Sequence, residues 1–210
     1  LELFRTGRTE LRVRAAEVLR DLGAEARDAV YALSSALQDS NVSVRRAAAD
    51  ALGGIGPAAS SAVPALIRAL DDRDVVGYAA RALGKIGPAA RSAIPALARL
   101  EQPEALAGIG AAAVPALIQL LGHERERTRV DAAKALEQIG PDARDAVPAL
   151  VRALGDPDWP VVVAALEALW AIGPAARAAV PALIQHVEAT CYVDYQPIEC
   201  AYSIIALQLI

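Results

Sequence analysis

The sequence predicts an all-α fold of stacked helical hairpins, because apolar residues recur with helical spacing and because one segment recurs along the chain. The copy over residues 58–87 shows both features. Its second, alanine-rich helix ends at Gly87, and the Pro88 that follows is favoured in the first turn of the next helix. A hairpin with a single apolar face cannot bury that face alone, so neighbouring copies must stack. The spacing i, i+3, i+4, i+7 in the first helix of this copy is occupied by Val63, Leu66, Ile67 and Leu70.

The composition limits which classes of protein this chain can belong to and which partners it can bind. Of the 210 residues 55% are hydrophobic but only 4% are aromatic, so the core is expected to consist of Ala, Leu, Val and Ile. The net charge of −4 argues against a general nucleic-acid binder, which normally presents a basic face. No apolar run approaches the length that spans a bilayer, so we expect no membrane helix. Cys191 and Cys200 give no disulfide framework, and we favour reduced structural thiols over a bridge or a metal site.

The beginning of the sequence is expected to continue an array of helices. Leu1–Phe4 look like the last turn of a helix, and Arg5–Thr9 look like a turn that contains Gly7. The chain has neither a Met nor a signal-peptide pattern, so we expect an excised segment whose true N-terminus lies outside the sequence. We expect a cytoplasmic protein, and export stays open for the same reason. A helix is predicted over residues 11–22, ending at Gly23.

Two markers set the register of the copies, which recur roughly every 30 residues. Each second helix is expected to end at a glycine, at Gly23, Gly56, Gly87, Gly110, Gly140 and Gly173. Each first helix begins with Val-Pro-Ala-Leu or its Ile variant, at Val63, Ile94, Val114, Val147 and Val180. A polar residue just before this segment is the expected N-cap, at Asp28, Ser61, Ser92 and Asp145.

Residues 44–57 carry a family resemblance. They read Val-Arg-Arg-Ala-Ala-Ala-Asp-Ala-Leu-Gly-Gly-Ile-Gly-Pro, and together with the Val-Pro-Ala-Leu-Ile segment and an acidic turn they resemble HEAT repeats. More narrowly, they resemble the short bacterial HEAT-like class first named from phycobilisome lyases. The resemblance covers essentially the whole chain. It implies a single repeat array over residues 1–210, a right-handed α-solenoid (superhelix) of about six hairpins with the second helix of each pair on the concave side.

The arginine ladder of such families is interrupted in this sequence. The resemblance implies that an Arg near the start of the second helix binds a turn Asp of its own or a neighbouring repeat. The residues that match this Arg are Arg12, Arg45 and Arg129. Val76 and Val162 replace it in other copies, and His123 stands where Asp39 or Asp156 would be. We therefore expect the ladder to contribute little stability.

Two copies are irregular. The copy near residues 95–113 is short, and its second helix is expected to shrink to about Pro103–Ala107, which predicts a kink near residues 100–112. The last copy, 188–210, is expected to hold a long loop over Glu188–Pro197 and then the apolar helix Ile198–Ile210. That helix is either a cap or the point where a further repeat has been cut away, and truncation is the favoured interpretation because caps usually have a polar outer face.

Motifs for catalysis are sparse. His123 and His186 lie in different repeats, and no nucleophile elbow, P-loop or dinucleotide fingerprint is present. The pair His123-Glu124 resembles one of the several His-Glu pairs that the HEAT-like di-iron hydroxylase of deoxyhypusine needs. We therefore expect no enzyme, no cofactor and no metal site.

Nucleic-acid binding is the weaker interpretation of the arginines in the first half of the chain. A HEAT-like family of DNA glycosylases binds DNA with a basic concave face. The arginines that could form such a strip are Arg12, Arg14, Arg20, Arg46 and Arg81. Carboxylates share their helices, at Glu17, Asp21 and Asp50, so a solvated mixed face is favoured and no nucleic-acid partner is expected.

The candidate binding site comes from positions that a stacked array leaves uncovered. In the helix over residues 44–55, the expected core positions are Val44, Ala48, Ala51, Leu52 and Ile55, and the expected outward positions are Arg46, Ala49, Asp50 and Gly53. Near the end of the chain the outward positions become apolar, since Val163, Leu166 and Trp170 follow the i, i+3, i+7 spacing. An exposed aromatic residue there is a candidate anchor for a protein partner. The predicted partner-binding set is Val130, Val163, Leu166, Glu167 and Trp170, with Arg46, Asp50 and Arg81 as polar contacts further along.

The alternative for Trp170 is that the 188–197 loop or Ile204 covers it. The leading function is a non-catalytic scaffold that binds a protein or peptide on its concave face. One rival is a bilin lyase-like protein that handles a chromophore, and a second is a regulatory or assembly segment of a larger protein. The sequence leaves the partner and the oligomeric state open.

Overall fold

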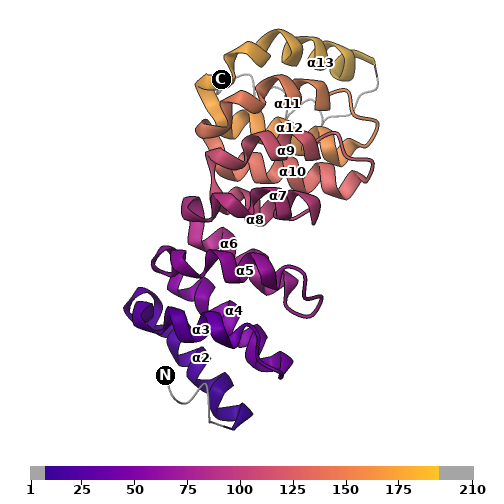
Figure 1. The fold of residues 1–210 in the computed structure, drawn as a ribbon. Helices are drawn as coiled ribbons and strands as arrows, with labels where there is room; N and C mark the ends of the chain where they lie inside the picture. Colours follow the sequence, from indigo (N-terminus) through magenta and orange to yellow (C-terminus); the bar gives the residue numbers. More distant parts are fainter. Residues whose placement is uncertain (1–7, 194–210) are drawn as a thin grey trace. The chain divides into compact units, whose positions relative to one another are not determined.

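The computed structural model describes the backbone of residues 8–193 and the side chains of residues 8–188, and this part of the chain is helical, with no strand (Figure 1). The first helices of the hairpins, the outer helices, are α3 (Val30–Ala36), α5 (Val63–Ala69), α7 (Ile94–Arg99), α9 (Val114–Leu120), α11 (Val147–Ala153) and α13 (Val180–Val193). The second helices, the inner helices, are α2 (Thr9–Leu22), α4 (Val42–Ile55), α6 (Val76–Ile86), α8 (Pro103–Ile109), α10 (Glu126–Ile139) and α12 (Trp159–Ile172). The predictions for Leu1–Phe4, for the side chains of Cys191 and Cys200, and for Ile198–Ile210 with Ile204 lie outside the described residues.

The chain forms two compact units, Leu1–Ile109 (unit 1) and Gly110–Ile210 (unit 2). In unit 1, α2 contacts α4, α4 contacts α6 and α6 contacts α8, while α3, α5 and α7 each contact the inner helix that follows. In unit 2, α10 contacts α12, and α9 and α11 each contact the inner helix that follows. Each unit is thus a stack with an inner and an outer layer of helices. The boundary between the units falls in the short repeat near residues 95–113, where the kink stays a prediction.

The expected glycine ends of the inner helices are confirmed. All six of the glycines named above have a positive φ, from 58° at Gly23 to 86° at Gly110. This left-handed conformation costs glycine little because it has no Cβ, so the chain can reverse direction there without strain.

The expected side-chain caps of the outer helices are wrong. The chain enters these helices through 3₁₀ helices, η1 (Gly23–Ala29), η2 (Gly56–Ala62), η3 (Gly87–Ala93), η4 (Ala111–Ala113), η5 (Gly140–Ala146) and η6 (Gly173–Ala179). The N-cap of α3 is Ala29 rather than Asp28, and it makes no side-chain cap hydrogen bond. Carbonyl groups of the preceding 3₁₀ turn accept the N–H groups at the helix start instead, and the N–H of Val30 donates to the carbonyl of Arg27. The prolines do lie in the first turn, as expected.

The inner helices of unit 1 approach one another at glycines. A Cβ added to Gly84 of α6 would lie 3.0 Å from the Cα of Ala105 in α8, and one added to Gly54 of α4 would lie 2.8 Å from the carbonyl oxygen of Arg20 in α2. The prediction that Ala49 and Gly53 face outward is wrong, because this stacking buries both residues. The flank of an inner helix is covered by the next inner helix, so only a narrow strip of each stays open.

The segment Trp159–Glu188 is long and apolar enough, by length and composition alone, to cross a membrane, and an 18-residue window within it has a mean hydropathy of 1.5. Half of that window is buried inside the structure, and Gly173 interrupts the segment with a φ of 65°. Its buried side chains, such as Val161, Leu169 and Ile172, form the core between α12 and its neighbours, whereas Trp170 and Ile184 are exposed.

The two irregular copies differ from expectation in different ways. Helix α8 is short, as expected, and runs over Pro103–Ile109. The loop predicted to begin at Glu188 is wrong for the described residues, since α13 continues to Val193. No glycine or proline interrupts the sequence between Pro181 and Pro197, so the helix has no reason to stop earlier.

Candidate partner-binding face

The start of each inner helix is tied to the next repeat by an arginine where the sequence supplies one. Arg12 of α2 pairs with Asp39, and Arg45 of α4 donates from Nε to Oδ2 of Asp72 at 2.7 Å. Nη1 of Arg45 also donates to the carbonyl oxygen of Asp39 at 3.0 Å. Arg45 therefore joins the turn before its own helix to the turn of the following repeat, and Arg12 reaches the turn of the following repeat at Asp39.

The corresponding link in unit 2 is made by Arg129, which is 8% exposed. Its Nε and Nη2 donate to the two carboxylate oxygens of Asp156 at 2.8 and 2.9 Å, and Nη2 also donates to Asp158 at 2.7 Å. Nη1 donates to the carbonyl oxygens of His123 and Glu124 at 2.9 and 3.0 Å. These bonds raise the pKa of Arg129, with the hydrogen bonds to Asp156 as the largest cause.

The turn residues that accept these bonds also fold their own turns. Asp72 and Asp156 each accept the backbone N–H of the residue two positions on, at 2.9 and 3.0 Å. His123 keeps that role in place of an aspartate, since its Nδ1 accepts the backbone N–H of Arg125 at 3.1 Å. The substitution at His123 therefore preserves the turn although it removes the carboxylate.

The pKa values of the two turn aspartates are lowered. For Asp72 the backbone hydrogen bond from Asp74 is the largest cause, and Arg45 adds to it. For Asp156 the largest single effect is burial, which raises the pKa. The hydrogen bonds from Arg129 and from the Asp158 amide together outweigh burial, so the pKa is lowered. Both carboxylates are thus held in their charged form by the turn and its arginine.

The predicted polar contacts of unit 1 are engaged in ion pairs or stacking. Arg46 donates from Nε to the carbonyl oxygen of Asp74 at 2.7 Å and from Nη2 to its carboxylate at 3.1 Å. Asp50 accepts from Nη1 of Arg20 at 3.0 Å. The guanidinium of Arg81 lies over the ring of Tyr78, 5.6 Å from its centre. The Arg46 and Asp50 pairs thus join neighbouring elements and balance the charge of Arg46 and Arg20, whereas Arg81 stacks within its own helix α6.

The predicted contacts of unit 2 lie on α10 and α12, but they do not form one apolar line. Trp170 is 48% exposed, whereas Leu166 is only 1% exposed. The expectation for Leu166 is wrong because its side chain is part of the core of the stack. Val163 and Val130 are half-buried. The open strip of this unit therefore presents one large aromatic side chain between partly covered aliphatic and charged residues.

The carboxylates beside Trp170 interact across the two inner helices. Glu167 lies one turn before Trp170 on α12, and Glu137 lies on α10. Burial is the main cause that raises the pKa of Glu137, and the negative charge of Glu167 raises it further, while Lys134 acts in the opposite direction. Helices α10 and α12 are in contact, so the half-buried Glu137 and Glu167 lie on neighbouring inner helices of the unit that carries Trp170.

Within residues 8–188, no group of three or more His, Cys, Asp or Glu side chains is arranged to hold a metal ion. His123 is engaged in the turn before α10, and His186 lies on the outer helix α13.

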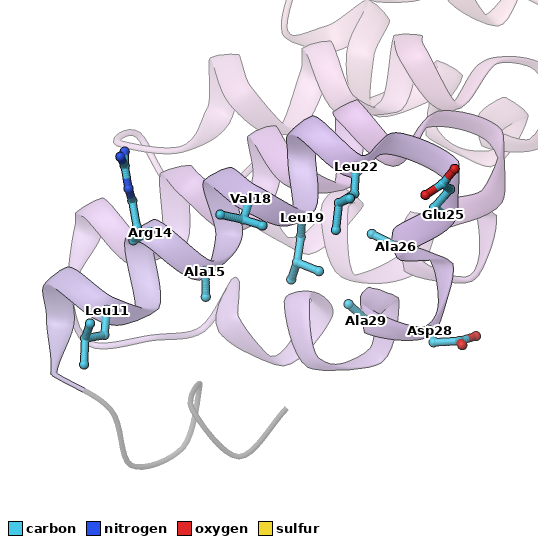
Figure 2. Close-up of a pocket in the computed structure, with 10 residues that line it drawn as sticks. All are labelled: Leu11, Arg14, Ala15, Val18, Leu19, Leu22, Glu25, Ala26, Asp28 and Ala29. Atoms are coloured by element: carbon cyan, nitrogen blue, oxygen red, sulfur yellow. The ribbon is translucent and has the colours of Figure 1, made fainter.

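The structure also contains an apolar hollow in unit 1 that the sequence pattern did not predict. It has a volume of about 640 Å³ and lies between α2 and η1 (Figure 2). Leu11, Val18 and Leu22 line it and are 53%, 53% and 50% exposed. Periodicity could not reveal it, because these residues occupy core positions of the repeat. Its one sequence signal is Val18, since the equivalent position in the later inner helices is alanine.

Comparisons with known proteins agree with this architecture. The family model for HEAT repeats matches residues 1–84 and 114–193, and the model for PBS lyase HEAT-like repeats matches residues 75–103. No curated protein matches the sequence significantly.

Solved structures with the same fold come from several sources. An archaeal HEAT-like repeats protein from Thermococcus onnurineus NA1 is 16% identical with a TM-score of 0.62, over 95% of this chain and 94% of that chain. An engineered protein is 25% identical with a TM-score of 0.56, over 98% and 66%. A chain in the complex of CpcE and CpcF of phycocyanin lyase from Nostoc sp. PCC7120 is 26% identical with a TM-score of 0.50, over 97% and 90%. Two-layer stacking, glycine-ended inner helices and the family match together establish that the chain belongs to the HEAT-repeat family.

Proposed function

We propose that the chain is a non-catalytic interaction scaffold that binds a protein or peptide on the inner-helix strip of unit 2, with Trp170 as its anchor. The observation that carries the proposal is the exposure of Trp170, at 48%, on a helix whose other large side chains are mostly buried. Tryptophan is strongly enriched among the residues that dominate binding energy, because it offers a large apolar area that few rotamers must order.

The surroundings of Trp170 support an anchor rather than a purely structural role. Val163 and Val130 are half-buried aliphatic residues of α12 and α10, and Glu167 and Glu137 are half-buried carboxylates of the same two helices. A central aromatic side chain inside a polar rim is the usual composition of a protein interface.

The test compares capture of a partner from lysate by the wild-type chain and by Trp170→Ala and Ile184→Ala. Ile184 lies on the outer helix α13 of the same unit and is 45% exposed, so it is a matched control for the loss of exposed apolar surface. We expect Trp170→Ala alone to lose the captured protein. In a Trp159→Phe background Trp170 is the single tryptophan, and its emission should shift to shorter wavelength when the purified partner is added.

A stability measurement separates an anchor from a core residue. Trp170→Ala should lower the free energy of unfolding by about 1 kcal/mol or less, as is usual for a surface change. The buried neighbour Leu166→Ala should lower it by about 2–5 kcal/mol. The proposal would be contradicted if Trp170→Ala lowered the free energy of unfolding by several kcal/mol, or if this variant still captured the partner as the wild-type chain does.

A chromophore-handling function is the second candidate, favoured by the PBS lyase HEAT-like match and by the likeness to a chain of the phycocyanin lyase complex. It predicts that a linear tetrapyrrole added to the purified chain shows a shifted absorption band. An unchanged spectrum at saturating protein would remove this candidate.

A further inference from the structure

Helix α6, in the inner layer of unit 1, has an open side on which every charged residue is cationic. It contacts α4 and α8 in its own layer, and α5, η2 and η3 beside them. The side that these elements leave open carries Gly77, Tyr78, Arg81 and Lys85, which are exposed and which we call the α6 strip. Residues 75–100 contain no Asp or Glu, so no carboxylate of α6 itself balances the charge of the strip.

The two cations of the α6 strip keep their hydrogen-bond donors available. On the neighbouring helix α4, Arg46 is paired with Asp74 at 3.1 Å. Arg81 and Lys85, in contrast, form no salt bridge or hydrogen bond with any other residue that the structure describes. A guanidinium and an ammonium together offer several N–H groups, and these favour an anionic ligand.

Both cationic side chains are nevertheless held by contacts along their length. The guanidinium of Arg81 lies over the ring of Tyr78, 5.6 Å from its centre. The stem of Lys85 reaches helix α4, where its Cδ would lie 3.5 Å from a Cβ added to Gly53. These contacts order the two side chains before a ligand arrives, which lowers the entropic cost of binding.

The cationic strip is only one helix wide. At the position that Arg81 occupies in α6, six residues before the closing glycine, α4 has Asp50 and α8 has Glu104. A nucleic-acid backbone presents phosphates over a broad surface, so it would also meet these carboxylates, in a chain whose net charge is −4. A single extended peptide that runs along α6 can avoid them. The width of the strip therefore favours a short acidic segment of a protein over a nucleic acid.

We propose that the α6 strip binds an extended acidic segment of a partner protein, with carboxylates at alternate positions that pair with Arg81 and Lys85. The two cations are four residues apart on the helix, which places their Cβ atoms about 6 Å apart. Side chains two residues apart in an extended peptide lie on the same side at a spacing of about 6.6 Å, which matches. The strip belongs to unit 1, so the proposal does not depend on the role of Trp170 in unit 2.

The test uses a fluorescein-labelled peptide, Ser-Gly-Glu-Ala-Glu-Ala-Glu-Gly-Ser, and measures its anisotropy as the chain is added. We expect saturable one-to-one binding that weakens as salt is added, because the contacts are between charges. The same peptide with every Glu replaced by Gln keeps the length and the hydrogen-bonding groups, and it should not bind.

Variants of the chain locate the binding surface. Arg81→Gln should weaken binding about tenfold, because it removes the guanidinium that can hold a carboxylate at two points. Lys85→Gln should weaken it as well. Arg68→Gln removes the same charge from an exposed residue of the outer helix α5, and it should leave binding unchanged. The circular dichroism spectrum of each variant should match that of the wild-type chain, because all three side chains are exposed.

Three results would overturn the proposal. The first is no binding of the glutamate peptide, or equal binding of the glutamine peptide. The second is an equal loss in Arg68→Gln and Arg81→Gln, which would show attraction by overall charge rather than by the α6 strip. The third is tighter binding of a labelled short DNA duplex than of the peptide, with a loss in Arg81→Gln, which would assign the strip to nucleic acid.

Discussion

Arg129 and Asp156 form a two-point pair between successive repeats, with Nε and Nη2 of the arginine 2.8 and 2.9 Å from the two carboxylate oxygens. Both side chains are about nine-tenths buried, at 10% and 11% exposure. A guanidinium and a carboxylate in this planar arrangement bind more strongly than a single-point pair. The same arginine holds the carbonyl oxygens of His123 and Glu124, so it fixes two turns at once. An interrupted ladder therefore still contains one strong link.

Arg129→Ala should lower the free energy of unfolding by about 3 kcal/mol, because it leaves the buried carboxylate of Asp156 and two carbonyl oxygens without their donor. Arg127→Ala on the same helix is the control. Arg127 is 93% exposed, its nearest approach to Asp131 is 3.6 Å, and its loss should cost about 0.5 kcal/mol or less. Urea denaturation of both variants measures the difference, and equal losses would show that the link is no stronger than a surface pair.

The stability of unit 2 should depend on the ionisation of Asp156. Its pKa in the folded chain is lowered, so its contribution is fully present above the unfolded value of about 4 and is lost as the pH falls through the folded value. Asp156→Asn should therefore destabilise the chain at pH 7, and the difference from wild type should shrink at pH 3. Denaturation curves at pH 7, 5 and 3 check this, and a difference that does not vary with pH would rule out the ionised carboxylate as its source.

Glu137→Gln should raise the stability of the folded chain at neutral pH, whereas Asp156→Asn should lower it. The pKa of Glu137 is raised, chiefly by burial, so its ionisation destabilises the folded chain as the pH rises above the unfolded value. The glutamine variant should be more stable than wild type at neutral pH, and the gain should disappear in acid, where both side chains are neutral. Glu167→Gln should give part of the same gain by removing the neighbouring charge. A variant that is less stable at pH 7 would contradict this account.

The inner-helix contacts predict opposite effects for two glycines of α6. Gly84→Ala places a Cβ 3.0 Å from the Cα and 3.1 Å from the carbonyl oxygen of Ala105, so α8 must shift and the chain should lose about 1–3 kcal/mol. Gly77→Ala meets nothing within 4 Å and should gain about 0.5 kcal/mol from helix propensity. Thermal unfolding of the two variants should therefore move the midpoint in opposite directions, and a shared direction would contradict the close packing of α6 on α8.

Local features of the fold could be predicted from the sequence because they depend on short-range chemistry. The helical spacing around Val63 and the glycine ends are encoded within a few residues, and the structure confirms both. The N-cap at Asp28 was the local exception, since the 3₁₀ turn before α3 satisfies the backbone without a side chain.

Burial of individual side chains was decided by the tertiary structure. Leu166 and Trp170 share the spacing that predicted one apolar line, yet one is in the core and the other is open. Leu22 and Ile55 occupy the same position of the repeat, but only Ile55 has an outer helix beside it among the described residues. The sequence alone determined which segments are helical and that the inner helices end at glycines, because those preferences are local. Only the packing of neighbouring helices decided which faces stay open, because exposure depends on the elements that cover a residue rather than on the residue itself.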